Sequence, residues 1–233
     1  MEKQAMAEIV RVEGVTKFYQ QGKVSVPALR GVDLSIQSGE FAAIAGPSGS
    51  GKTTLLNMIG GLDKPTRGRV SIEGTYLSAM SKGQLGKMRL NRIGFIFQSY
   101  NLIPVLTAYE NAEFVLLLQK CPAEERRERV ISLLEEVGLK GLEQRIPSEM
   151  SGGQQQRVAI ARSIAPEPAL VLADEPTANV DSQTAAELLD LMEQLNRTKQ
   201  ITFVFSTHDP AVMERARRLI TLKDGTVDRD VMK

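Results

Sequence analysis

The chain has 233 residues, of which 42% are hydrophobic and 24% charged, and its formal net charge is +1. This composition predicts an ordinary globular core and argues against a disordered chain. The near-zero charge gives no reason to expect broad binding to nucleic acid or anionic lipid. A single cysteine, Cys121, allows no internal disulfide and favours a reducing compartment. No apolar run approaches the ~20 residues of a membrane span, so any membrane role should depend on a partner.

The first third of the sequence carries the signals of short β-strands. Residues 9–12 and 32–36 alternate apolar and polar side chains, roughly as half-buried strands do. Residues 41–45 form a wholly apolar run followed by glycine, which suits a buried parallel strand. Two further strands are predicted at residues 70–72 and 93–97.

A glycine-rich segment, the phosphate loop, joins the strand at 41–45 to a helix predicted at about residues 53–61. The loop comprises Gly46, Pro47, Ser48, Gly49, Ser50, Gly51, Lys52 and Thr53. Its glycines let backbone N–H groups turn toward phosphate oxygens, and the helix N-terminus adds partial positive charge. Lys52 would reach the β- and γ-phosphates, the Thr53 hydroxyl would bind Mg²⁺, and Thr54 would add a nucleotide contact. By chance such a glycine turn should arise in roughly one chain of this length in a hundred.

The middle of the chain, from about residue 100 to 165, is mainly helical in its pattern. Pro122 opens one of these helices. Apolar residues of that helix recur at i, i+3, i+4 and i+7 on one face, namely Val130, Leu133, Leu134 and Val137. This spacing predicts an amphipathic helix that packs against other helices.

Strand signals return in the last third of the sequence. They fall at residues 170–173, 201–205 and 219–222, and a helix at about 184–195 separates the first two. Alternation of strands and helices predicts a parallel α/β sheet. The helical block at about 100–160 is then an insertion into that sheet.

Two carboxylates, Asp174 and Glu175, follow the apolar strand at 170–173. Ligands bind at the carboxyl ends of strands in a parallel sheet. We expect Asp174 to hold Mg²⁺ through water, and Glu175 to polarise the attacking water as general base. Strands often end in acidic residues, so the pair alone is weak evidence for a nucleotide site. Together with the phosphate loop it becomes strong evidence.

A second glycine-rich segment, the signature segment, stands at residues 151–155 as Ser-Gly-Gly-Gln-Gln and precedes a predicted helix. With it, the sequence resembles the ATPases of the ABC transporter family from about residue 9 to 227. Because the segment precedes a predicted helix, it provides a second helix N-terminus that could bind a γ-phosphate. The resemblance implies that two copies meet head to tail. Each ATP would lie between one copy's phosphate loop and the other's Ser151, Gly152, Gly153 and Gln154.

Other positions match the family one by one. Tyr19 is similar to the aromatic residue that stacks on adenine, although its surroundings in sequence also suit a core tyrosine at a strand edge. Gln98 resembles the glutamine that contacts Mg²⁺ and senses the γ-phosphate. Asp181 matches the loop that communicates between the two sites, where this chain has Ala178 and Val180 in place of the commoner Gly and Leu.

His208 is the only histidine of the chain and follows the strand at 201–205. The sheet edge should place it near Glu175, and it matches the family's switch histidine, which contacts the γ-phosphate and orients the water. With Lys52, Glu175 and His208 all present, the resemblance implies an active ATPase. A nucleotide-binding scaffold without turnover is disfavoured for the same reason.

The resemblance also implies the fold and its division. We expect an α/β P-loop NTPase of the ABC cassette type, with a mostly parallel sheet, an N-terminal antiparallel β part and an inserted helical subdomain. One domain should cover residues 1–233. Its core should lie at about 1–98 and 166–233, and its helical subdomain, which carries the signature segment, at about 99–165.

Three strings, at residues 57–63, 94–98 and 173–177, resemble the LolD/MacB/FtsE branch of the family. The branch implies partners: a second copy, a permease pair of MacB, LolC, LolE or FtsX type, and through the permease a periplasmic adaptor. It implies work in export, lipoprotein release or mechanotransmission at the cytoplasmic face of the inner membrane. Apolar residues at 100–106 suggest a docking loop for the permease.

An alternative is a soluble ABC ATPase that acts on nucleic acid or ribosomes. Such proteins usually carry long coiled-coil insertions or two cassettes in one chain. This chain has neither, and its charge is nearly neutral. We therefore expect no nucleic-acid partner. A neighbouring reading frame for a permease with a large extracytoplasmic domain would discriminate between the two.

Overall fold

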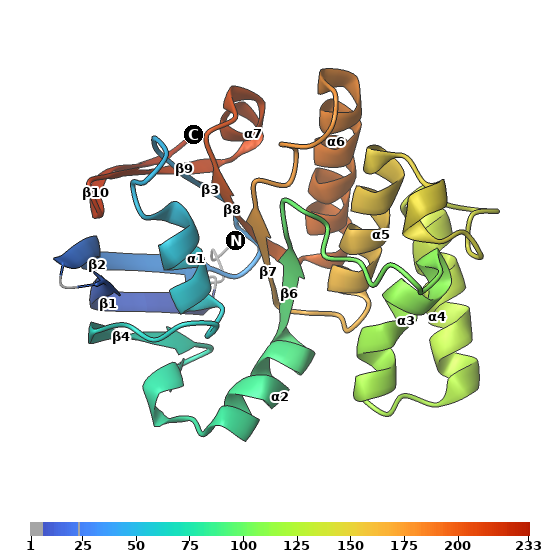
Figure 1. Ribbon diagram of the computed structural model, residues 1–233, viewed down its shortest axis with the longest axis horizontal. Coiled ribbons are helices and arrows are strands. Elements are labelled where there is room, and N and C mark those ends of the chain that lie inside the picture. The colour runs from blue at the N-terminus through green and yellow to red at the C-terminus, as the bar shows by residue number, and fades with distance from the viewer. Residues whose placement is uncertain (1–6, 23) are drawn as a thin grey trace, which may run out of the picture.

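The computed structural model describes residues 7–22 and 24–233, which form two β-sheets and the helices around them (Figure 1). One sheet is four-stranded, in the order β2-β1-β4-β5, and the other six-stranded, in the order β10-β9-β3-β8-β7-β6. The strands of the first are β1 (Glu8–Gln21), β2 (Val24–Gln37), β4 (Arg67–Ile72) and β5 (Thr75–Tyr76). Those of the second are β3 (Phe41–Ala45), β6 (Ile93–Ile96), β7 (Leu170–Asp174), β8 (Thr202–Thr207), β9 (Arg218–Lys223) and β10 (Thr226–Met232).

The helices lie on both sides of the larger sheet. They are α1 (Lys52–Ile59), α2 (Lys82–Arg92), α3 (Ala108–Leu118), α4 (Ala123–Glu136), α5 (Gly152–Ile164), α6 (Ser182–Lys199) and α7 (Pro210–Arg215), with single 3₁₀ turns at Leu77–Ala79 and Pro147–Glu149. Figure 1 shows α3 to α6 on one side of β7 and β8, and α1 with the antiparallel strands on the other. No helix in residues 7–22 and 24–233 combines the length and the apolar character that crossing a membrane requires.

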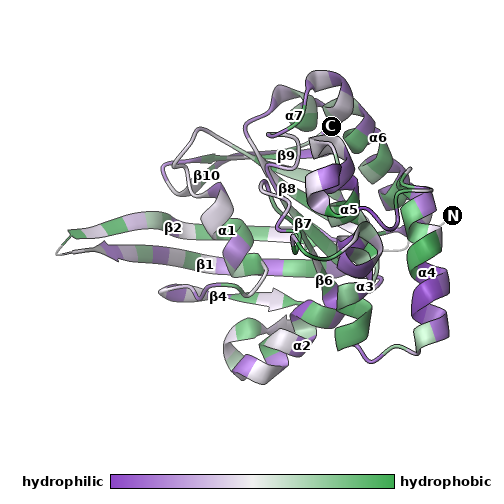
Figure 2. Cartoon of the chain, turned by 45° about the vertical axis from the view of Figure 1, so that its right-hand side comes forward, coloured by the Kyte–Doolittle hydropathy of each residue, from purple (hydrophilic) through white to green (hydrophobic). Residues whose placement is uncertain are grey.

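The central strands of the larger sheet are apolar because both of their faces are covered (Figure 2). Strand β3 pairs in parallel with β8 and β9, and β7 pairs in parallel with β8 and β6. Successive residues of β3 point to opposite faces. Phe41 therefore joins a core with α3 to α6, whereas Ala42 and Ile44 join a second core with α1 and the antiparallel sheet. The expected mostly parallel sheet with an N-terminal antiparallel part and a helical insertion is confirmed.

Several elements differ from the expectation in extent. The two short strands predicted at 9–12 and 32–36 belong to a long hairpin of 14-residue strands, β1 and β2. The sequence patterns predict neither helix α2 nor strand β10. Helix α2 is polar and contains Gly83 and Gly86, so its periodicity is weak, and its start is fixed by a capping box between Ser81 and Gln84.

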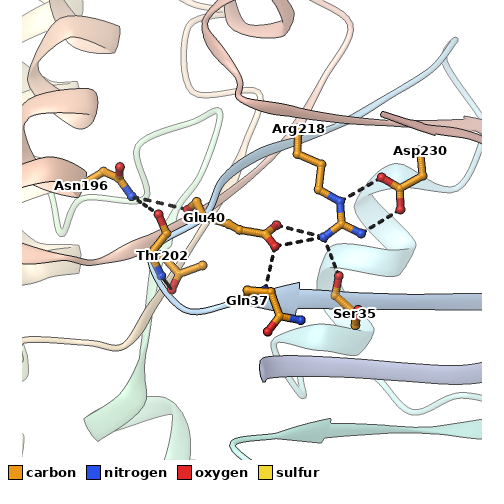
Figure 3. Close-up of polar contacts among 8 residues, drawn as sticks. Ser35, Gln37, Glu40, Asn196, Thr202, Arg218 and Asp230 are labelled. Carbon is orange, nitrogen blue, oxygen red and sulfur yellow. Dashed lines mark hydrogen bonds and ion pairs between the residues drawn. The ribbon is translucent and has the colours of Figure 1, made fainter. Parts of the chain in front are cut away.

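A partly buried polar network connects the start of β3 to the last two strands, β9 and β10 (Figure 3). The Glu40 carboxylate accepts from Arg218 Nη1 at 3.0 Å, and Asp230 accepts from Arg218 Nη2 at 2.7 Å. The hydrogen bond to Asp230 and the charge of Glu40 raise the pKa of the Arg218 guanidinium. Asn196, near the end of α6, donates to the backbone oxygens of Gly39 and Ile201. The network lies at the amino end of β3, whereas the phosphate loop begins at the carboxyl end of the same strand.

We expect Arg218→Met to lower the free energy of unfolding by about 3 kcal/mol, because it leaves the Glu40 carboxylate buried without its partner. Side-chain exposure is only 12% for Arg218 and 6% for Glu40. Urea denaturation at neutral pH would measure the change. Arg229→Met, on the exposed face of β10, is the matched control and should change stability by less than about 0.5 kcal/mol. Equal effects of the two substitutions would contradict this account of the network.

Candidate functional site

The phosphate loop turns from the end of β3 into α1 through positions that only glycine fits. Gly46 has φ of 152°, and a Cβ there would lie 2.3 Å from the backbone oxygen of Leu222. Gly51 has φ of 102°, and its Cβ would lie 2.5 Å from the backbone oxygen of Ala28. The loop is thus pressed between β2 and β9, and it presents the N-terminus of α1 with its free N–H groups.

The Lys52 side chain lies within this loop. Its Nζ donates to the backbone oxygen of Gly46 at 2.8 Å and to that of Pro47 at 3.0 Å. The residue is only 7% exposed. A positive charge is therefore held where the loop and the start of α1 converge, which suits a multiply charged anion.

A cavity of about 510 Å³ opens in front of the loop. It is lined by Ala28, Pro47, Ser48, Gly49, Gly51, Lys52, Thr53, Thr54, Gln98, Glu175 and His208. The cavity thus gathers residues from β2, the phosphate loop, α1 and the ends of β6, β7 and β8. Parallel pairing of β6, β7 and β8 explains this, because their carboxyl ends meet at one sheet edge.

Glu175 and His208 face each other across this edge. Glu175 Oε1 lies 2.7 Å from His208 Nδ1, and Glu175 Oε2 accepts from the Thr207 hydroxyl at 3.1 Å. The Glu175 side chain is 14% exposed, whereas that of His208 is 70% exposed. A sheltered carboxylate with an exposed imidazole beside it can take a proton from water and contact a group entering from outside.

Oxygen ligands suited to Mg²⁺ lie next to Lys52. The Thr53 hydroxyl donates to Asp174 Oδ1 at 3.0 Å. Gln98 lines the same cavity, and its backbone oxygen accepts from the Asn179 amide at 2.7 Å. Hydroxyl, carboxylate and amide oxygens are the hard ligands that Mg²⁺ prefers, commonly together with substrate phosphates. The residues present therefore fit the metal.

Tyr19 is not a core residue, because 37% of its surface is exposed. Its hydroxyl donates to Asp63 Oδ2 at 2.9 Å, and Lys17 Nζ lies 4.9 Å from its ring centre. Lys17 also donates to Asp63 Oδ1 at 2.8 Å. Partial burial and the bond to Asp63 raise the pKa of the Tyr19 phenol. The ring is thus anchored and partly exposed, although Tyr19 is not among the residues that line the cavity.

The signature segment lies elsewhere. Ser151 begins α5 in a capping box: its Oγ accepts from Gln154 N at 3.3 Å, and Gln154 Oε1 accepts from Ser151 N at 3.0 Å. A Cβ on Gly153 would lie 2.5 Å from the Thr184 methyl group, so α5 starts against the start of α6. Asp181 caps α6 by accepting from Thr184 N at 2.9 Å. Neither Ser151 nor Asp181 is among the cavity-lining residues.

A second, apolar cavity of about 540 Å³, the apolar groove, lies between α2, α3 and β6. Its apolar lining includes Leu62, Leu90, Phe95, Phe97, Phe114 and Leu118. Within residues 100–106, the expected docking loop, Asn101 lines this cavity, whereas the apolar residues of the loop do not. The Asn111 amide instead bonds to the backbone of Ile103 and Leu106, which ties that loop to α3.

Sequence reasoning missed the residues that support the site rather than form it. Thr207 bonds to Glu175, and its place directly before His208 is a usable signal. Asp63 anchors Tyr19 from 44 positions away, and no local pattern points to that contact.

Comparison with known proteins decides the family. A model of the ABC transporter family matches residues 29–178, more than half of the chain. The chain belongs to the ABC transporter ATP-binding family. The chain accordingly binds ATP and is an ATPase.

Individual relatives agree with this. A lipoprotein-releasing system ATP-binding protein, LolD of Anaeromyxobacter dehalogenans, is 46% identical over 95% of this chain and 93% of its own length. The macrolide export ATP-binding/permease protein MacB of Syntrophobacter fumaroxidans is 40% identical over 95% of this chain but only 31% of its own length. The solved cassette MJ0796, a dimer bound to ADP and Pi, has a TM-score of 0.89 and 44% identity, covering 96% of this chain and 98% of its own. The resemblance to the LolD and MacB branch is thereby confirmed.

Proposed function

We propose that this ABC ATPase works as a head-to-tail homodimer that closes on ATP and drives a pair of permease subunits. The proposal rests on the separation of the expected ATP-binding residues into two groups that lie apart in one chain. Lys52, Glu175 and His208 share one cavity, while Ser151 caps an exposed helix start outside it. A closely similar cassette is dimeric with ADP and Pi bound, which supports completion of each site by a second copy.

The residues then divide the work. The phosphate loop and Thr54 hold the nucleotide's phosphates, while Thr53, Gln98 and Asp174 hold Mg²⁺, which would neutralise phosphate charge. Glu175 is the general base, and His208 contacts the γ-phosphate and orients the water. Ser151, Gly152, Gly153 and Gln154 of the partner copy close the site from the other side. Asp181, beside the signature segment, links one site to the other.

The proposed division of the chain follows the same lines. The core lies at about residues 1–98 and 166–233, and the helical subdomain at about 99–165. Helices α3, α4 and α5 support this division. They lie between β6 and β7 in the sequence, they group together on one side of the molecule (Figure 1), and α5 begins at the signature segment.

Tyr19→Ala should raise the KM for ATP about tenfold with little change in kcat, because it removes the ring proposed to stack on adenine. Loss of one base–aromatic stack costs about 1–3 kcal/mol. Steady-state ATPase titrations would measure it. Tyr19→Phe keeps the ring but not the bond to Asp63, and should stay within about threefold of the unmodified chain. A Phe variant as weak as the Ala variant would contradict stacking as the main contribution.

For the partner, we propose a permease of MacB, LolC, LolE or FtsX type that inserts a short cytoplasmic helix into the apolar groove. Phe114 and Leu118 are 40% and 55% exposed there, an unusual placement for large apolar side chains at a cavity. This attachment would hold the chain at the cytoplasmic face of the inner membrane. Export, lipoprotein release and mechanotransmission are the functions such a complex would serve, with a periplasmic adaptor reached through the permease.

Phe114→Asp should abolish recovery of the chain with its permease from native membranes, because a carboxylate would be buried in an apolar contact. Co-purification through a tag on the chain, followed by identification of the bound proteins, would test this. Val231→Asp is the matched control, since Val231 is 42% exposed on β10, outside the groove. Equal recovery of both variants with a permease would contradict the proposed docking, as would recovery of ribosomes or nucleic acid in its place.

A further inference from the structure

Gln156, on the second turn of α5, is buried without full hydrogen bonding. Its relative exposure is 0%. Its Nε2 donates to the backbone oxygen of Pro176 at 2.7 Å, and its Oε1 is buried with no partner among the described residues. Burying a half-satisfied amide costs free energy that an apolar side chain would avoid. Packing therefore does not explain a glutamine at this position.

The capping of α5 does not explain it either. The first turn is capped by Ser151 and Gln154. Gln155, the neighbour of Gln156, donates to the backbone oxygen of Met150 at 3.1 Å and so stays within its own segment. The bond of Gln156 instead spans 20 positions and joins α5 to the turn after β7.

That turn carries Glu175. The backbone φ of Glu175 is 46°, which lies in the left-handed region that residues other than glycine rarely adopt. Its N–H donates to the Ser206 oxygen at 2.9 Å, and its own oxygen accepts from Ala178 N at 3.2 Å. Pro176 has no N–H, so its carbonyl is the only hydrogen-bonding group that it offers. Gln156 donates its hydrogen bond to that carbonyl.

We infer that Gln156 is a positioning residue. Its hydrogen bond to the Pro176 carbonyl fixes the strained turn that orients the Glu175 side chain. The inference rests on the proposed role of Glu175 and adds a residue to that mechanism. In this role, Gln156 makes α5 a rigid connection between the signature segment and the turn that carries Glu175 in the same chain. Ser151, at its start, would contact the ATP held by the partner copy, and Gln156, five residues on, holds the same chain's own general base.

Gln156→Met keeps the length of the side chain and removes its amide. We expect kcat for ATP hydrolysis to fall about 10- to 100-fold, since small displacements of a catalytic group have effects of that size. The KM for ATP and the melting temperature should change little. In the presence of ATP, dimers should persist longer, because hydrolysis is what reopens them. Gln194→Met, on the exposed face of α6, is the matched control and should leave kcat within about twofold.

A double-mutant cycle with Glu175→Gln tests whether Gln156 acts through Glu175. The double variant should be no slower than Glu175→Gln alone, because the group that Gln156 positions is already disabled. An additional loss in the double variant, an unchanged kcat in Gln156→Met, or dimers that dissociate faster would each overturn the inference. Should Met unfold the chain, Gln156→Asn, whose amide is too short to reach Pro176, provides the same cycle. Full turnover by Glu175→Gln alone would instead overturn the proposed general base, so the two failures are distinguishable.

Discussion

Glu175→Gln should lower kcat for ATP hydrolysis by about 10²- to 10⁴-fold, the range that a general base contributes. The substitution keeps the shape of the side chain and an oxygen that can still accept from the Thr207 hydroxyl. It removes the basic oxygen that faces His208 Nδ1 at 2.7 Å. The turn after β7 should therefore stay intact while proton transfer fails.

A phosphate-release assay would measure the rate, and binding of a fluorescent ATP analogue would show that the site is still occupied. Glu128→Gln, on the exposed face of α4, is the matched control and should not change turnover. Turnover by Glu175→Gln close to that of the unmodified chain would mean that another group activates the water.

Lys52→Ala should weaken ATP binding about 100-fold, equivalent to about 2.8 kcal/mol. Two effects add. The ammonium that would bond to the phosphates is lost, and charge-assisted hydrogen bonds are worth about 1.5–3 kcal/mol each. The backbone oxygens of Gly46 and Pro47, which accept from Lys52 Nζ, also lose their donor, so the phosphate loop becomes less ordered.

Equilibrium binding of ATP, measured by calorimetry, would test the prediction. Lys87→Ala removes an equal charge from the exposed face of α2 and serves as the control. Similar affinities of the two variants would show that the loop binds phosphate through its backbone alone.

The parts of the site that sequence predicts are those encoded locally. An apolar strand, a glycine turn and a helix start adjoin in residues 41–53, so their geometry follows from neighbouring residues. Glu175 and His208 meet although they are 33 positions apart, because each follows a parallel strand. Strands β7 and β8 are in register from Leu170 with Thr202 to Asp174 with Ser206, which brings their carboxyl ends together.

The parts that sequence does not predict depend on tertiary contacts with no local pattern. The bond of Tyr19 to Asp63 joins β1 to the segment after α1, and that of Gln156 to Pro176 joins α5 to the turn after β7. Apolar residues at 100–106 suggest a docking surface, but the groove is formed mainly where α2, α3 and β6 converge, and Asn101 is the residue of that segment that lines it. Only the packing of these elements determines which apolar side chains remain exposed.

The central claim is that the phosphate loop of one copy and the signature segment of another make one ATP site. Sedimentation of Glu175→Gln with ATP and Mg²⁺ tests it most directly, alone and combined with Ser151→Tyr. Ser151 is exposed and lies outside the cavity, so the added bulk should spare ATP binding to the single chain. We predict that ATP converts Glu175→Gln from monomer to dimer, and that the added Ser151→Tyr leaves it monomeric with ATP still bound. Dimers of the double variant that form as readily as those of Glu175→Gln would contradict the claim.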